Sequence, residues 1–571
     1  RKMKNISKIC VSSFLLFVVV IKSQTFGWAK SYGGETPEGA LAVTVDPSGN
    51  IISTGIFRGT ADFDPGTGTA IRTSLGDWDV FIQKLDSDGN FLWVKTFGGA
   101  SADHAESVFT DQNGNVYTTG RFMQTVDFDP SAEVTSYSSS GDFDAFIQKL
   151  DSDGNFLWAK AFGGASNDEI YSLKVDNNGN VYTTGHFNGS VDFDPGSEVY
   201  TLATSENNRN TFVQKMDTNG NFLWAKSFAG GANWGTSLNL DSSGNIYTTG
   251  TIFGQTDFDP GSGTFLLNSS QYYGTFVQKM DSSGNFLWAK SFGGSYNLNT
   301  SYSTVDSSGN IYTTGSFDFP GDYDPSDGTS TLTSNGHQDV FIQKMDASGN
   351  FLWAKNFGGS CEYCVDVSKS IAVDSFGSIY TTGFFANITD LDPGTGTANY
   401  TSAGYHDIFI QKLDTSGNFI WGKSLGSSAQ FLSETGQSLY VDSEGSVLVT
   451  GNFCGIVDFD DGSGVANLTP VGPSDIFLLK ITQNLLSSTA EESRFDALVY
   501  PNPTSGKVQL VLQESLENVE LLLSDSSGTI ISKQNKKLSK INQLELPKNS
   551  GIYFLTVKTP KGNKTFKLIK K

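Results

Sequence analysis

Short runs of alternating or continuous apolar residues, separated by polar turns, fill most of the chain. Residues 172–176 and 181–185 are two such runs, and the turn between them reads Asn-Asn-Gly-Asn. Residues 146–150 and 156–160 form a second pair, joined by a similar polar turn at 151–155. Polar turn residues with glycine between β-rich runs predict hairpins. The pattern therefore predicts units of four short strands.

This unit recurs seven times. Two markers, a Trp in the fourth strand and an Asp before the first turn, return every 64 to 68 residues. The markers are Trp28, Trp93, Trp158, Trp224, Trp288, Trp353 and Trp421, and Asp46, Asp111, Asp176, Asp241, Asp306, Asp374 and Asp442. Four strands repeated at a fixed period are typical of a β-propeller blade.

The two ends of the repeat complement each other. The first unit opens with a fourth-strand phrase at 28–30, and the last stops after a third-strand phrase at 476–480. Pairing these strands would close a ring and remove two exposed strand edges, which otherwise favour aggregation. We therefore predict an all-β fold over residues 25–482: a seven-bladed β-propeller with four-stranded blades, whose N-terminal strand completes the last blade. An open solenoid is the alternative, and it leaves both ends unpaired.

The repeat also resembles a known family. The phrase Asp-Ala-Phe-Ile-Gln-Lys-Leu-Asp at 144–151, followed by Gly154-Asn155, Leu157-Trp158 and Gly163-Gly164, resembles the bacterial β-propeller repeat called SBBP. The resemblance covers roughly residues 26–482 and implies the fold. It implies no shared catalytic activity, because propellers carry many functions.

The N-terminus predicts export. Basic residues precede an apolar run at 11–21, which is too short to cross a ~30 Å hydrocarbon core but suits a signal peptide. We assign residues 1–24 to the signal peptide, with cleavage near Ser23-Gln24. No other segment is long and apolar enough to cross a membrane.

The C-terminal part differs in composition from the repeats. After a polar linker at 483–495, alternating apolar runs in residues 496–571 predict a small β-sandwich. The phrase Tyr-Pro-Asn-Pro at 500–503, Ser-Gly-Ile-Tyr-Phe at 550–554 and a Lys-rich end resemble the type A sorting domain of the type IX secretion system. The resemblance implies that residues 496–571 engage the secretion machinery and deliver the protein to the cell surface or the medium. An ordinary adhesion module is the alternative.

Charge is unevenly distributed. The 571 residues carry a formal net charge of −22, yet residues 1–22 carry +5 and 496–571 carry +6, which leaves −33 between them. Such an acidic body makes nucleic acid an unsuitable partner, since a basic footprint is missing.

An acidic pair lies between the second and third strands of each unit. The pairs are Asp62/Asp64, Asp127/Asp129, Asp192/Asp194, Asp257/Asp259, Asp322/Asp324, Asp390/Asp392 and Asp458/Asp460. Carboxylates at i and i+2 of an extended segment point the same way and could reach one calcium ion, the only cofactor that the sequence suggests. The alternative is that these aspartates organise turns through local bonds to the backbone.

Tryptophan and cysteine give further candidates. A Trp at one fixed place in every blade predicts packing between blades, whereas Trp78 and Trp234 fall outside that pattern, in loop-like contexts, and are candidates for ligand contact. Cys361 and Cys364 are predicted to form a local disulfide between blades five and six. Cys454 is then left over, with no assigned role.

No catalytic phrase is present: the G-x-S-x-G, H-E-x-x-H and Walker patterns are all missing. The function we expect is non-catalytic binding or adhesion toward a glycan or protein ligand. A secreted hydrolase or lyase is one alternative, which an inward-facing acid, His or Tyr in a single blade would favour. A repetitive surface scaffold, which would self-associate, is the other.

Overall fold

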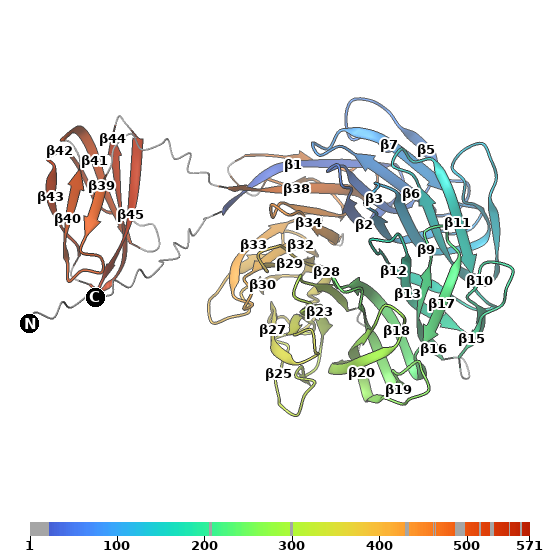
Figure 1. The fold of residues 1–571 in the computed structure, drawn as a ribbon. Coiled ribbons are helices and arrows are strands. Elements are labelled where there is room, and N and C mark those ends of the chain that lie inside the picture. The colour runs from blue at the N-terminus through green and yellow to red at the C-terminus, as the bar shows by residue number, and fades with distance from the viewer. Residues whose placement is uncertain are drawn as a thin grey trace, which may run out of the picture. The chain divides into compact units, whose positions relative to one another are not determined.

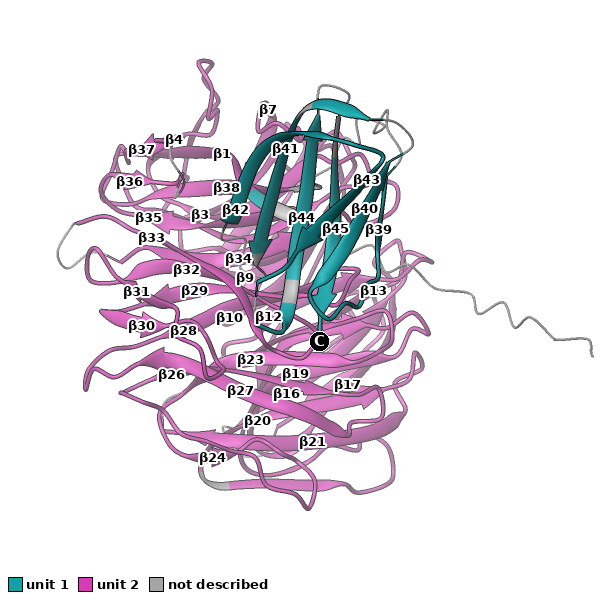
Figure 2. Cartoon of the chain, turned by 90° about the vertical axis from the view of Figure 1, so that its left-hand side faces the viewer, with its two compact units in different colours: residues 1–24, 484–571 teal, residues 25–483 magenta. Residues whose placement is uncertain are grey.

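The computed structural model describes residues 22–204, 208–296, 301–428, 433–460, 462, 464–485, 497–512, 515–525, 530–547, 549–559 and 562–571. Every regular element in these ranges is a β-strand. The chain divides into two compact units, Thr25–Gln483 and Asn484–Lys571 with Arg1–Gln24 (Figure 2). The predicted signal peptide lies outside the described residues up to position 21, as do positions 486–495 of the predicted linker. Over the described ranges, no helix could serve as a membrane span.

The first unit is a β-propeller, as predicted. Its described strands form seven antiparallel sheets that each hold the same four-strand unit, called a blade below. Blade 1 holds β2 (Glu38–Val45), β3 (Ile51–Phe57), β6 (Asp79–Leu85) and β7 (Phe91–Phe97); blade 2 holds β8 (His104–Thr110), β9 (Val116–Asp127), β10 (Ser136–Leu150) and β11 (Phe156–Phe162). Blade 3 holds β12 (Glu169–Val175), β13 (Val181–Asn188), β16 (Arg209–Met216) and β17 (Phe222–Ser227); blade 4 holds β18 (Ala229–Leu240), β19 (Ile246–Asp257), β20 (Leu266–Met280) and β21 (Phe286–Ser295). Blade 5 holds β22 (Tyr302–Val305), β23 (Ile311–Phe317), β26 (Asp339–Met345) and β27 (Phe351–Gly359); blade 6 holds β28 (Val367–Val373), β29 (Ile379–Phe385), β32 (Asp407–Leu413) and β33 (Phe419–Leu425). Blade 7 joins β34 (Thr435–Val441), β35 (Val447–Phe453) and β38 (Asp475–Leu485) to β1 (Lys22–Gly34).

The blades form a closed ring (Figure 1). The first strand of each blade contacts the first strand of the next, from β2 through β8, β12, β18, β22, β28 and β34 and back to β2. We call these seven the inner strands. Closure depends on β1, which is the outermost strand of blade 7 and lies beside β38, so the two ends of the repeat share one sheet.

Hairpin turns at the ends of the strands are fixed by aspartate. In the first turn of blade 3, Asp176 Oδ1 accepts bonds from the backbone N–H groups of Asn178 and Asn180, each 2.9 Å long. Gly179 adopts a left-handed φ of 82°, which only glycine takes at no steric cost. The repeated Asp-x-x-Gly phrases thus encode the turns directly.

The interface between neighbouring blades is called a seam below. On this turn side, a Lys of one blade donates to a backbone carbonyl in a turn of the next blade in six of the seven seams, with a Trp beside it. In the seam between blades 1 and 2, the Trp93 indole N–H donates to Ser152 O (3.3 Å), and Lys84 Nζ donates to the same carbonyl (2.9 Å). A Cβ on Gly154 would lie 3.2 Å from the Trp93 ring, so only glycine allows the turn to rest on the indole. The predicted packing of the repeated Trp residues between blades is confirmed.

The closing seam keeps the Lys bond and the contact of the Trp ring with a turn glycine, although its strands come from opposite ends of the chain. The Trp28 indole N–H, unlike that of Trp93, has no hydrogen-bond partner in the described residues. Lys480 Nζ donates to Ser87 O (2.9 Å), and the Trp28 ring lies 3.1 Å from the Cβ position of Gly89. Within blade 7, the hydroxyls of Thr25 in β1 and Thr482 in β38 are 2.9 Å apart. Blade 7 therefore contacts blade 1 through a Lys bond and a Trp ring on a glycine, as blade 1 contacts blade 2.

The linker prediction needs one correction at its start. Gln483 belongs to β38, is buried, and donates from Nε2 to the Tyr380 hydroxyl at 2.6 Å. It is held in blade 7 because this bond fills the seam with blade 6, where blade 7 has no turn between a third and a fourth strand.

Between the second and third strands of each blade lies the loop that carries the acidic pair. Five of these loops contain a further short hairpin, formed by β4 (Thr60–Asp62) and β5 (Ile71–Thr73), β14 (Ser190–Asp192) and β15 (Thr201–Ala203), β24 (Gly321–Asp322) and β25 (Thr331–Leu332), β30 (Ile388–Asp390) and β31 (Asn399–Thr401), or β36 (Val457–Asp458) and β37 (Asn467–Leu468). The residue between the two aspartates, such as Phe63 or Phe128, is fully buried in the blade core. Alternation along the strand then turns both aspartates outward.

The second unit packs two sheets face to face (Figure 2). One holds β39 (Ala497–Tyr500), β40 (Lys507–Leu512) and β43 (Ile541–Glu545); the other holds β41 (Leu516–Asp525), β42 (Ile530–Leu538), β44 (Gly551–Thr559) and β45 (Gly562–Lys570). Buried residues of both, among them Leu510 and Leu555, form one core. Asn502 of the Tyr-Pro-Asn-Pro phrase accepts from Ile569 N (2.8 Å) and donates to Lys567 O (2.6 Å), which ties this phrase to the basic C-terminal strand.

Replacing Trp28 tests closure. Trp28→Ala removes a half-buried ring from the closing seam and is expected to lower the free energy of unfolding by about 2 kcal/mol, below the ~3–5 kcal/mol of a fully buried aromatic. Urea unfolding followed by far-ultraviolet circular dichroism measures this. Leu92→Ala, at a half-exposed position of the outer strand β7, is the control and should cost much less. Equal, small effects would contradict the closing role.

Candidate binding face

The acidic loops and the connections between blades share one face of the ring, called the loop face below. Gly33, at the end of β1, pairs with Asp62 of the next loop, and Gly98 and Gly358 pair in the same way with Asp127 and Asp390. These two kinds of loop therefore open on the same face.

Backbone N–H groups occupy the acidic pairs. In blade 1, Asp62 Oδ1 accepts from Asp64 N and Ala70 N, and Asp64 Oδ1 accepts from Gly66 N. The same three bonds, 2.7–3.1 Å long, recur in all seven loops. This geometry supports the turn interpretation.

Both members of every pair take part in these bonds. The first aspartate accepts the backbone N–H groups of the residues two and eight positions later; it is Asp62, Asp127, Asp192, Asp257, Asp322, Asp390 or Asp458. The second accepts the backbone N–H of the residue two positions later, at 2.7–2.9 Å; it is Asp64, Asp129, Asp194, Asp259, Asp324, Asp392 or Asp460.

The acidic pairs stand apart from other metal-ligating side chains. Within the described ranges, no group of three or more His, Cys, Asp or Glu side chains could hold a metal ion, so none of the paired aspartates belongs to such a cluster. Each loop folds its two carboxylates onto its own backbone, as Asp62 and Asp64 do in blade 1. Calcium binding itself stays a prediction.

A different set of acids lies in the seams on the loop side. Five seams bring together two carboxyl groups. One lies two residues before the Phe of a third-strand phrase, and the other lies at or just before the start of the first strand of the next blade. The pairs are Asp79/Asp103, Asp144/Asp168, Asp339/Asp366, Asp407/Glu434 and Asp475/Glu38. All ten side chains are buried. In the first pair, Asp103 accepts from Gly99 N (2.8 Å) and Met123 N (3.1 Å), whereas Asp79 accepts from Leu75 N alone.

Among the described residues, one buried carboxyl oxygen in each of these five seams finds no hydrogen-bond partner. It is Asp79 Oδ1, Asp144 Oδ1, Asp339 Oδ1, Glu434 Oε2 or Glu38 Oε2. An unpaired buried carboxylate is costly, and a proton removes both the charge and the unpaired acceptor. Burial, reinforced by Asp475, raises the pKa of Glu38 to about 8. Burial raises the pKa of Asp103 and Asp168 to about 7, each reinforced by its partner carboxyl.

The centre of the ring is a cavity of about 360 Å³ lined by all seven inner strands. Most of its lining is small or apolar, but Glu106, Tyr171, Lys174 and Lys369 also contribute. Burial raises the pKa of Glu106 to about 7, although the charges of Arg121 and Lys369 oppose this shift. The channel therefore carries charged side chains at particular blades rather than around the whole ring.

Blades 2 and 3 carry a cluster that other blades lack. Arg121 of β9 pairs with Glu169 of β12 at 2.7 Å, and the Tyr171 hydroxyl donates to Glu169 Oε2 at 2.7 Å. The Arg121 guanidinium also lies over the Phe143 ring, 4.8 Å from its centroid. Burial alone would raise the pKa of Glu169, but His186, Arg121 and these hydrogen bonds lower it below its usual value.

His186 of β13 belongs to the same cluster. Its ring stacks on Tyr171 at a centroid distance of 5.7 Å and is 1 % exposed, with neither ring nitrogen hydrogen-bonded within the described residues. Burial lowers the pKa of His186 to about 4, so the imidazole is neutral at physiological pH. His186 therefore supports Tyr171 as a packing surface.

The two predicted ligand-contact tryptophans differ in their surroundings. Trp78 lies in the loop before β6 on the loop face, half-buried, and its carbonyl accepts from Asp103 N at 2.7 Å. Trp234 lies in the inner strand β18, not in a loop, is only 9 % exposed and packs edge-on against Tyr273 at 5.9 Å. The loop prediction for Trp234 is wrong because the connection before β18 is short and the strand begins at Ala229.

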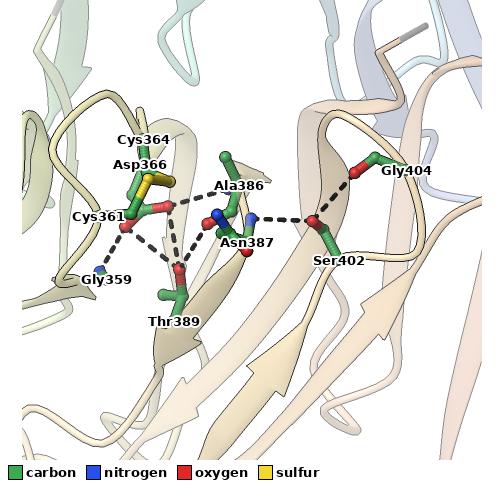
Figure 3. Close-up of a disulfide and its surroundings, with 9 residues drawn as sticks. All are labelled: Gly359, Cys361, Cys364, Asp366, Ala386, Asn387, Thr389, Ser402 and Gly404. Carbon is green, nitrogen blue, oxygen red and sulfur yellow. Dashed lines mark hydrogen bonds between the residues drawn. A yellow bond between two sulfur atoms is a disulfide. The ribbon is translucent and has the colours of Figure 1, made fainter. Parts of the chain in front are cut away.

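Cys361 and Cys364 form the predicted disulfide in the connection between blades 5 and 6 (Figure 3). Next to it, Asp366 accepts from Gly359 N (2.7 Å), Ala386 N (3.2 Å) and the Thr389 hydroxyl, so the disulfide closes a loop over a seam carboxyl (Figure 3). Cys454 is a buried free thiol, whose pKa burial raises to about 11.

Sequence reasoning missed the seam acids and the blade 2–3 cluster. A signal for both was present, because aligning the seven repeats places acids at one position and shows that the positions of Arg121, Glu169 and Tyr171 vary from blade to blade. What the alignment does not give is which positions of neighbouring blades face each other.

Comparison with known families agrees with the division of the chain. Residues 498–571 match the secretion system C-terminal sorting domain, and residues 157–190 match the β-propeller repeat SBBP. Residues 498–571 are a type IX sorting domain. The sorting domain marks the protein for export to the cell surface or beyond, and neither matched family is a catalytic one.

Curated relatives are distant. The chain is 25 % identical over 518 residues to the uncharacterized WD repeat-containing protein L264 of Acanthamoeba polyphaga mimivirus, an alignment covering 75 % of the chain and 36 % of that protein. It is 28 % identical over 153 residues to the regulatory protein FlaEY of Caulobacter vibrioides, covering 25 % of the chain and 16 % of that protein. The chain thus spans about a third or less of the length of these relatives.

Solved structures show similarity at low scores. PorZ, a surface component of the type IX secretion system of Porphyromonas gingivalis, is 11 % identical with a TM-score of 0.25, and the match covers 96 % of this chain and 100 % of PorZ. A protein of unknown function from Dyadobacter fermentans is 10 % identical with a TM-score of 0.35, covering 81 % and 99 %.

The seam carboxyls predict a pH-dependent ring. A group whose pKa is raised by folding stabilises the fold at acidic pH, and this contribution is lost as pH rises through the folded pKa. With pKa values of about 6 for Asp79, about 7 for Asp103 and about 8 for Glu38, the melting temperature should fall between about pH 5.5 and pH 8.5. Asp46 does not interfere, because its pKa is lowered and it titrates below this window.

Glu38→Gln should reduce that fall, because the amide faces Asp475 and Thr36 without a charge to lose. Asp153→Asn, an exposed turn residue, should leave it unchanged. Thermal scans at both pH values measure the effect, and a wild-type melting temperature independent of pH would refute the prediction.

Proposed function

We propose that the exported propeller is a non-catalytic binding or adhesion module, at the cell surface or released, whose loop face and channel hold a glycan or protein ligand. The observation that carries this proposal is one position of the inner strands that differs from blade to blade and lines the channel, occupied by Leu41, Glu106, Tyr171, Thr236, Lys369 and Gln437. The repeated acids have structural tasks in turns and seams, whereas these residues are free of that repeat and face the cavity.

The non-catalytic part rests on the blade 2–3 cluster. Glu169 accepts bonds from both Arg121 and Tyr171, and His186 is buried beneath Tyr171. Groups held in this way build a surface and are poorly placed to exchange protons with a substrate.

One observation favours a hydrolase or lyase as the second candidate. Glu106 has a raised pKa and Glu169 a lowered one, and carboxyls whose pKa values are displaced in opposite directions are the usual acid and base of such enzymes. Glu106 lines the channel and is therefore an inward-facing acid in a single blade, which an enzyme would need.

Binding and turnover separate the two candidates. The full chain is screened against glycan and protein arrays, and bound polysaccharides are assayed for new reducing ends and unsaturated products. We expect Lys369→Ala to weaken binding about tenfold, Glu106→Gln to leave product formation at background, and Asp153→Asn to act as wild type. Product formation that Glu106→Gln abolishes would establish the enzyme instead, and concentration-dependent self-association without any ligand would favour a scaffold.

We also propose that the acidic pairs stabilise turns without calcium. Because Asp62 and Asp64 already accept three backbone N–H bonds, EDTA should leave both ligand binding and melting temperature unchanged. Calorimetry with EDTA and with added calcium measures this. Loss of stability in EDTA that calcium restores would show that the loops bind the ion.

A further inference from the structure

Three aromatic rings gather on the loop face at the seam between blades 4 and 5. Tyr272 stacks on Phe319 with centroids 5.3 Å apart and planes 18° apart, and Tyr296 lies 5.8 Å from Tyr272 and 5.7 Å from Phe319. Tyr296 is 67 % exposed and Phe319 40 % exposed. We call these three residues the aromatic platform.

Hydrogen bonds fix the platform in place. Asp318 accepts from Tyr296 N (2.8 Å) and from the Ser295 hydroxyl (2.9 Å), which joins the connection after β21 to the loop after β23. Tyr272 comes from a bulged part of β20, between the residues that pair with Ile252 and Gly254. Since the rings already contact one another, a ligand would find them arranged before it binds.

Comparison of the seven repeats shows that folding does not require these rings. At the position of Phe319, the other six loops use a residue in the left-handed region, with φ between 62° and 84°. These residues are Gly59, Gln124, Gly189, Gly254, Asn387 and Gly455. Blade 5 has Phe319 followed by Pro320 instead, so an aromatic ring replaces the tight turn.

At the same seam, blade 4 has a glycine where other blades have a repeated acid. Gly274 occupies the place that Asp79 and Asp144 hold in blades 1 and 2, just before the third-strand phrase. Tyr272 precedes it by two residues, where blades 1 and 2 have Asp77 and Asp142. Blades 4 and 5 therefore replace charge by aromatic surface at the loop face.

The chemistry of this surface points to carbohydrate. Exposed aromatic faces receive the apolar C–H faces of sugar rings, and within the described residues the hydroxyls of Tyr272 and Tyr296 have no hydrogen-bond partner and can bond sugar hydroxyls. The net charge of −33 in residues 23–495 repels polyanions, so uronate-rich or sulfated chains are poor ligands. A neutral polysaccharide suits both the rings and the charge.

We propose that Tyr272, Tyr296 and Phe319 form a binding platform for a neutral polysaccharide. The inference rests on the proposed binding function and names its ligand class and a second contact region, outside the channel.

Affinity electrophoresis and calorimetry of the full chain test the platform. The probes are laminarin and mannan as neutral polysaccharides and alginate as a polyanion. We expect a neutral probe to bind, alginate not to bind, and Tyr296→Ala and Phe319→Ala each to weaken binding about tenfold, the loss expected for one stacking ring. Tyr296→Phe keeps the ring and should lose less than Tyr296→Ala.

Tyr405→Ala is the matched control. Tyr405 holds the Tyr272 position in blade 6 and is 56 % exposed, but the facing loop after β35 in blade 7 has Gly455 at the position of Phe319. Its replacement should leave binding unchanged, and melting temperatures exclude misfolding.

Neutral-glycan binding unaffected by folded Tyr296→Ala and Phe319→Ala variants would overturn the platform. If Lys369→Ala then weakens that binding, the channel function survives its failure. The carbohydrate assignment would be overturned if neither neutral probe bound, or if the platform variants lost binding only to a protein ligand. Polysaccharide cleavage would overturn the proposed function itself.

Discussion

The pairing of β1 with β38 is the constraint on which the propeller depends. Blade 7 has only three strands of its own, and without β1 its outer edge and the turn of blade 1 that carries Gly89 would face solvent. Once β1 is in place, the Trp28 ring rests on Gly89 and Lys480 donates to a backbone carbonyl of blade 1, as the Trp93 ring and Lys84 do in the seam between blades 1 and 2. Seven sheets then share one ring, and the inner strands enclose a channel.

The ring uses two kinds of electrostatic contact on its two sides. On the turn side, Lys groups reach backbone carbonyls of the next blade, and Lys84 also pairs with Asp46 at 2.8 Å. On the loop side, two carboxyl groups share each of five seams, and one oxygen in each of these seams has no donor in the part of the chain that the structure describes. A proton can satisfy that oxygen, so a strongly acidic protein can bury ten carboxyl groups between its blades without ten buried charges.

A repeat protein carries its own internal comparison. The seven copies show which residues the fold needs, since turn aspartates, seam glycines and core phenylalanines recur. Residues that differ between the copies are then free to serve binding. Examples are Arg121 and Glu169 in blades 2 and 3, and Tyr296 and Phe319 at the seam between blades 4 and 5. Both groups lie on or near the loop face, away from the Trp contacts that hold the blades together.

The sequence by itself determined the strands, their turns and the two domains. Period and local chemistry encode these directly: Asp176 and Gly179 specify a turn through bonds within a few residues, and the ends at Trp28 and residues 476–480 indicate a missing strand. Only the tertiary structure decided which side chains meet, because a seam joins residues that belong to different blades. Asp79 meets Asp103, and Tyr272 meets Phe319, through the angle at which one twisted sheet packs on the next, and that angle is set by the whole ring.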